Sequence, residues 1–157
     1  MLIDRLNMFS TDQAITVDAI SENVIDLGPL GGATANTIRD IGAGRTLYLH
    51  ILVKETFDSA EEDATLDVTL ESDSTADLAT SATVHWTSTL VIAEATLVAG
   101  YWIAKGIAIP SGAYERYLGL RFNNATHAFT AGKVDAWISE NRYDDRTYEA
   151  GFTTGIN

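Results

Sequence analysis

The three histidines are the first candidates for chemistry, because imidazole changes its charge near neutral pH and is a common metal ligand. His50, His85 and His127 fall in three different predicted elements. None has a second histidine at the one-residue or four-residue spacing that places two ligands on one face of a strand or helix. We therefore expect three structural histidines whose ring nitrogens are satisfied by local hydrogen bonds.

Sequence patterns of other catalytic sites are also absent. No serine stands in the Gly-x-Ser-x-Gly context of a nucleophile elbow. The chain has no cysteine, so thiolate nucleophiles and cysteine-ligated metals are excluded. The glycine-rich segment 28–32 lacks the spacing and the lysine of a phosphate-binding loop, and nothing selects two of the 22 acidic residues as a glycosidase pair. The sequence predicts no catalytic residue, no cofactor and no metal site, and therefore no enzyme.

Two acidic stretches remain as candidates for binding an ion. One consists of Asp58 and residues 61–63, and the other is the predicted turn 73–77. Carboxylates are calcium ligands, but neither stretch has the central glycine and terminal glutamate of the twelve-residue calcium loop. We expect solvated loop tips that keep an acidic surface soluble, and the alternative of a bound calcium ion stays open.

The tryptophans point to contact surfaces. If alternate residues of the segment 134–138 face the core, Trp137 projects to the opposite face of its strand. An exposed tryptophan on a sheet face is a candidate interface anchor. The alternative is that an N- or C-terminal arm of the same chain covers this face. Both interpretations make Trp137 a docking residue.

Period-two alternation indicates the strands that position these residues. Apolar residues recur at every second position in four segments, and three further segments have strand composition. No amphipathic helix longer than about two turns is indicated, the nearest candidate being residues 93–99. About seven short strands separated by turns are typical of an all-β sandwich or barrel. The expected strands are 46–53, 65–71, 117–122 and 133–138, together with 24–27, 84–92 and 101–109.

The composition is that of one globular domain with an acidic surface. The chain has 157 residues, 46% hydrophobic and 20% charged, with a formal net charge of −12. Nucleic acids and anionic membrane surfaces are bound by clustered Lys and Arg, so this balance disfavours both partners. The sequence shows neither a signal-peptide pattern nor an apolar run of about 18 residues, and we expect a soluble protein that is not exported by a classical signal.

Both ends of the chain are predicted to contact another molecule. Residues 1–11 are apolar with few charges, and the segment 141–152 combines aromatic residues with arginines, as interfaces do. The alternative for the N-terminus is that residues 1–9 form an edge strand of the chain's own sandwich. We expect residues 1–140 to form one sandwich domain and residues 141–157 a C-terminal arm. The predicted contact residues are Leu2, Ile3, Leu6, Phe9, Trp137, Tyr143, Tyr148 and Phe152.

Six segments of the chain resemble the capsid cement (decoration) proteins of short-tailed and related bacteriophages, the group typified by the Bordetella phage cement protein. The resemblance covers roughly residues 1–140, and its strongest pieces are Glu-Arg-Tyr-Leu-Gly-Leu at 115–120 and Phe-Thr-Ala-Gly-Lys-Val-Asp-Ala at 129–136. The other segments are 24–28, 44–49, 65–73 and 97–101.

The resemblance implies a jelly-roll-like β-sandwich with extended arms that forms small homo-oligomers on the outside of a phage shell. Such a protein is made in the bacterial host cytoplasm and then clamps neighbouring major capsid proteins against the pressure of packed DNA. We expect a trimer, with a dimer as the alternative. A carbohydrate-binding sandwich whose Trp102, Trp137 or Tyr101 stacks on sugar rings is the second hypothesis, and a small hydrolase is the third.

Overall fold

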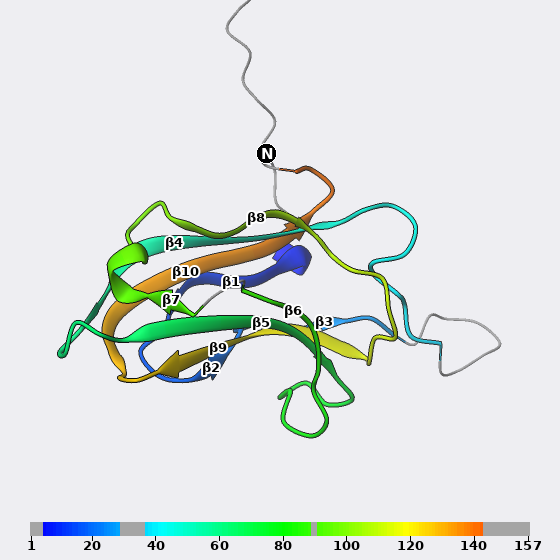
Figure 1. The fold of residues 1–157 in the computed structure, drawn as a ribbon. Helices are drawn as coiled ribbons and strands as arrows, with labels where there is room; N and C mark the ends of the chain where they lie inside the picture. Colours follow the sequence, from blue (N-terminus) through cyan, green and yellow to red (C-terminus); the bar gives the residue numbers. More distant parts are fainter. Residues whose placement is uncertain (1–4, 29–36, 89–90, 143–157) are drawn as a thin grey trace, which may run out of the picture.

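A computed structural model describes residues 5–28, 37–88 and 91–142, which form an all-β sandwich of two antiparallel sheets (Figure 1). Sheet A contains, in spatial order, β1 (Met8–Ala14), β10 (Phe129–Ser139), β4 (Tyr48–Ser59) and β8 (Trp102–Ala108). Sheet B contains β2 (Ala19–Ile20), β9 (Tyr117–Ala125), β5 (Thr65–Asp73) and β6 (Thr83–Thr87), with β3 (Ile25–Asp26) paired to β9 and β7 (Ile92–Ala93) paired to β5. In the described part of the chain the only helical elements are the short 3₁₀ turns η1 (Arg5–Asn7) and η2 (Glu94–Thr96).

The strand order is that of a jelly roll. The pairs β2–β3 and β6–β7 each act as one interrupted strand, because both members pair with the same neighbour. The chain changes sheet at every connection between the resulting strands, for example from β4 to β5 and from β9 to β10, except between β5 and β6, which are neighbours in sheet B. Double-sheet jelly rolls are built in this way. The predicted fold class is therefore confirmed.

The core lies between the two sheets, where the alternation in the sequence placed it. In β4, Leu49, Ile51 and Val53 are buried, and β5 contributes Leu66 and Leu70 from the facing sheet. Further core residues come from β9 and β10, namely Leu118, Leu120, Phe122, Val134, Ala136 and Ile138. Burial of these apolar side chains is the main force that holds the sheets together.

The N-terminal segment requires a correction. Residues 8–14 are the edge strand β1 of sheet A and pair with β10, and the side chain of Phe9 is 0% exposed in the core. The prediction that Phe9 contacts a neighbour is therefore wrong, and for Met8 and Phe9 the edge-strand alternative holds. Period-two alternation does not reveal β1, because its pairing has two register shifts and Asp12 adopts a positive φ of 49°. The predicted strand 84–92 is likewise interrupted, forming β6 and β7.

The outer face of sheet B is covered by the loop that joins β5 to β6, which comprises residues 74–82. Leu78 of this loop is fully buried, and a Cβ atom added at Gly119 of β9 would lie 2.9 Å from Leu78 Cδ1. Below the loop, Arg121 Nε donates to Glu71 Oε2 at 2.9 Å, and Arg121 Nη2 donates to the Leu78 carbonyl. β5 is consequently buried on both faces over much of its length.

Candidate functional site

Three aromatic rings from neighbouring strands of sheet A form the most distinctive side-chain cluster. His50 of β4 stacks on Trp137 of β10, with ring centroids 5.3 Å apart and an interplanar angle of 16°. Trp102 of β8 meets both rings edge-on, at 6.3 Å from His50 and 5.8 Å from Trp137. The register causes this meeting, because Trp137 pairs with His50 across the β10–β4 ladder and β8 lies on the other side of β4. Lys105 Nζ lies 5.9 Å from the Trp102 ring, within cation–π range.

His50 serves as a junction between three strands. Its Nδ1 accepts a hydrogen bond from the Gly106 backbone N–H at 3.2 Å, so Nε2 carries the proton. Nε2 lies 3.1 Å from both Ser139 Oγ and the Asn141 carbonyl. The side chain is buried. These contacts tie β4 to β8 and to the end of β10, which is a structural role.

Trp137 occupies the face of β10 that the sequence indicates, opposite Val134, Ala136 and Ile138. Its side chain is only 4% exposed and one face of the ring is stacked on His50. The Trp137 ring is therefore not exposed as an interface anchor, and it is not accessible for stacking on a sugar ring. Trp102 is half-buried beside it, while Leu6 in η1 is 80% exposed. The remaining predicted contact residues, Leu2, Ile3, Tyr143, Tyr148 and Phe152, lie outside the described residues.

A serine–histidine pair that sequence spacing does not reveal is formed by β5 and β6. Ser72 Oγ lies 2.7 Å from His85 Nε2, and the His85 ring stacks on Tyr114 at 3.9 Å. Ser72 is fully buried, and its Oγ also accepts the Glu115 backbone N–H at 2.9 Å. A nucleophile has to reach its substrate, and this hydroxyl is enclosed. The pair therefore fastens the segment before β9 to the edge of sheet B.

The surroundings of this pair shift two pKa values. Burial lowers the pKa of His85, against the opposing influence of Asp40 and Glu115, and so favours a neutral ring at pH 7. Burial, assisted by the Asp40 charge, raises the pKa of Tyr114 to about 12. The Tyr114 hydroxyl donates to the Pro110 carbonyl. Asp40 itself accepts backbone N–H groups from Gly42 at 3.0 Å and Gly112 at 3.2 Å, which joins two loops at this end of the sandwich.

The acidic stretches turn out to have different environments. Asp73 is buried, and its carboxylate accepts backbone N–H groups from Thr75 at 3.2 Å, Thr80 at 2.9 Å and Ser81 at 3.0 Å. Burial of this carboxylate raises its pKa, but the hydrogen bonds outweigh that effect and lower the pKa to about 2. The prediction of a solvated tip is thus wrong for Asp73.

In the other acidic stretch, the exposed Asp63 Oδ1 lies 2.6 Å from His127 Nδ1. All three histidines therefore make hydrogen bonds, as expected, but their partners lie far away in the sequence. Across residues 5–28, 37–88 and 91–142, no group of three or more His, Asp or Glu side chains is arranged to hold a metal ion.

Comparison with models of known protein families finds a match. The model of the Bbp16 family matches residues 9–138, a range that begins in β1 and ends in β10 and so includes both sheets. A search of curated proteins found no match. Among the described residues, no helix is long and apolar enough to cross a membrane.

Proposed function

Since this chain belongs to the Bbp16 family, which is named for a Bordetella phage protein, we propose that it is a structural protein of a phage virion. In this proposal it decorates the outer surface of a tailed-phage capsid and clamps neighbouring major capsid proteins. The observation that carries the proposal is that the family match runs from β1 to β10, over residues 9–138. The chain itself is phage-related by this membership.

The construction of the sandwich supports a bracing role. Buried polar groups fasten its loops to its strands: His50 joins three strands of sheet A, and Asp73 closes the β5–β6 loop. Glu94 of η2 accepts the Ser59 backbone N–H at 3.1 Å and the Ser59 hydroxyl. A stiff body loses little conformational entropy when it binds, so more of its contact energy is available for clamping.

The proposed partners are the major capsid protein and further copies of this chain. A formal net charge of −12 repels packaged DNA and suits a position on the outside of the shell. A ligand that binds the assembled shell but not its free subunits stabilises the assembly by mass action. The protein is then dispensable for assembly and needed for resistance to heat and osmotic shock.

The experiment compares virions with and without this protein. We expect density for the sandwich at fixed sites on the outer shell by electron cryomicroscopy. Virions that lack the protein should release their DNA at a lower temperature, and adding the purified chain back should restore the original release temperature. Virions without fixed density, or with equal heat resistance in both preparations, would contradict the proposal.

A further inference from the structure

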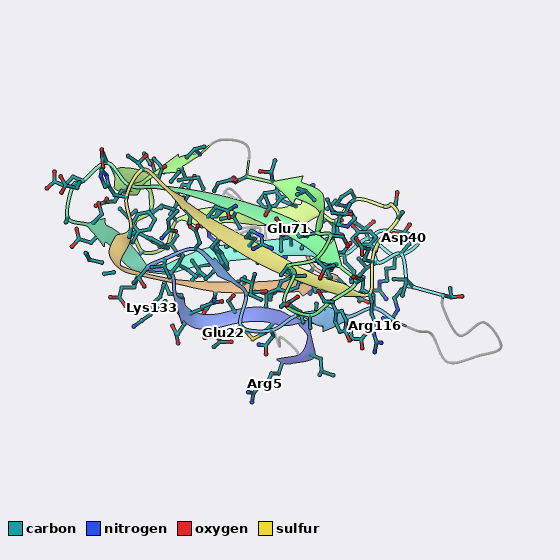
Figure 2. All side chains as sticks on the ribbon, turned by 90° about the horizontal axis from the view of Figure 1, so that it is seen from below. Arg5, Glu22, Asp40, Glu71, Arg116 and Lys133 are labelled. Carbon is teal, nitrogen blue, oxygen red and sulfur yellow. The ribbon has the colours of Figure 1, made fainter. Side chains whose placement is uncertain are left out.

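One lateral side of the sandwich is formed by a stretch of the chain that contains few charged residues. Between Asp77 and Glu115 the sequence has only two charged residues, Glu94 and Lys105, although 20% of the chain is charged. This stretch forms β6, β7 and β8, of which β6 and β8 are the last strands of their sheets. Glu94 is buried against Ser59, and Lys105 lies over the Trp102 ring. Elsewhere charged side chains occur at both ends of the molecule, with Asp40 and Arg116 at one end and Lys133 toward the other (Figure 2).

The edges of the sheets differ in how they are protected. Edge strands avoid pairing with other chains by carrying charges or by being very short. β8 carries the exposed Lys105, β1 carries the exposed Asp12, and β2 and β3 have two residues each. β6 is five residues long and has one register shift against β5, but no charged residue and no proline. It is the least protected edge among the described strands.

Exposed valines lie along this edge. Val84 on β6 is 54% exposed, and Val91, directly before β7, is 56% exposed. We call the edge formed by β6, β7 and these two valines the uncharged edge. Depletion of charge combined with exposed apolar side chains is typical of the centre of a protein interface.

β6, the longer strand of the uncharged edge, is anchored at both of its ends. At one end of β6, Thr83 Oγ1 donates to Glu115 Oε1 at 3.2 Å. At the other end, Thr87 Oγ1 and Ser88 Oγ donate to Asp67 Oδ1 at 3.3 Å and 2.9 Å. The two carboxylates thus anchor both ends of the strand and form a polar rim. A strand held in this way has little conformational freedom left to lose on binding.

The charge distribution indicates what binds here. Two copies of a chain with a formal net charge of −12 repel each other wherever their carboxylates approach. The electrostatic repulsion between two copies is smallest where they meet along the uncharged edge. In a symmetric contact, each copy then places its own uncharged strand and valines against those of the other copy. We propose that a second copy of this chain docks against the uncharged edge. This inference deepens the proposed function, because it assigns the surface that joins the copies on the shell.

The test is the mass of the protein in solution, measured by sedimentation equilibrium without any capsid present. The wild-type chain should form a species heavier than 17.0 kDa at micromolar concentration, and added salt should strengthen the association by screening the net charge. Val84→Lys and Val91→Lys should each weaken the association at least tenfold. Because lysine makes the net charge less negative, general repulsion between the copies cannot explain such a loss.

Val17→Lys is the matched control, since Val17 is 61% exposed in the turn between β1 and β2, away from this edge. It should associate like the wild type, and all three variants should keep the wild-type far-UV circular dichroism spectrum, which shows that they are folded. A monomeric wild type, or equal association of the Val84 and Val17 variants, would overturn the inference. Either result leaves the proposed function standing if virions still show the protein at fixed sites, so the two failures are distinguishable.

Discussion

At the residue scale, the Asp73 carboxylate ties the start of the β5–β6 loop to its end. It stays ionised in the folded protein because three backbone N–H groups point at it, and its pKa falls from 3.8 to about 2. We expect Asp73→Asn to lower Tm at pH 7. The asparagine side chain has a single acceptor oxygen, so it cannot accept the backbone N–H groups that bind to both oxygens of the carboxylate. The stabilisation from the ionised group is complete above about pH 3.8 and is lost as the pH falls toward 2. Thermal unfolding of both proteins between pH 7 and pH 2 measures this difference.

The control for this prediction is Asp77→Asn in the same loop. Asp77 is exposed, and its carboxylate accepts the Thr75 hydroxyl at 2.6 Å and the Ala79 N–H at 3.3 Å. Its substitution should change Tm less than that of Asp73. A Tm difference between wild type and Asp73→Asn that stays constant from pH 7 to pH 2 would show that ionisation of Asp73 has no part in stability.

At the element scale, the β5–β6 loop acts as a third layer over sheet B. Leu78 is buried against Gly119, where any larger residue would collide with Leu78 and Val24. We expect Leu78→Ala to reduce the free energy of unfolding by about 2–5 kcal/mol, the range for a buried leucine that leaves a cavity. Urea unfolding measures the effect.

Val17→Ala is the comparison for the loop experiment, because Val17 lies in the turn between β1 and β2 and is 61% exposed. Its effect on the free energy of unfolding should stay within about 0.5 kcal/mol. If Leu78→Ala were as mild as Val17→Ala, the loop would be only loosely attached to sheet B.

At the scale of the whole molecule, the sandwich and the C-terminal segment are expected to have separate tasks. Deleting residues 143–157 leaves β10 intact, together with Ser139 and Asn141, which contact His50. We expect the truncated chain to keep its far-UV circular dichroism spectrum and to bind shells lacking the protein more weakly. Quantitative decoration of such shells measures this. Full occupancy at wild-type affinity would mean that the segment is not an anchor.

The sequence by itself determined the fold class, because alternation along a strand is a local property. Leu49, Ile51 and Val53 are buried where period two predicts them, and the same holds in β5, β9 and β10. β1 was anticipated only as an alternative for residues 1–9, because its register shifts and the positive φ of Asp12 break the alternation. The sequence also did not indicate that the β5–β6 loop covers the outer face of sheet B, since Leu78 and Gly119 come together only in the folded chain.

For the candidate site, the sequence singled out Trp137 and the correct face of its strand. Only the tertiary structure decided that His50 covers its ring, that Ser72 and His85 form an enclosed pair, and that β6 is an uncharged edge. These groups are contributed by strands far apart in the chain, and the pairing register brings them together. Burial and exposure of a given side chain depend on which strands become neighbours, and no local pattern encodes that.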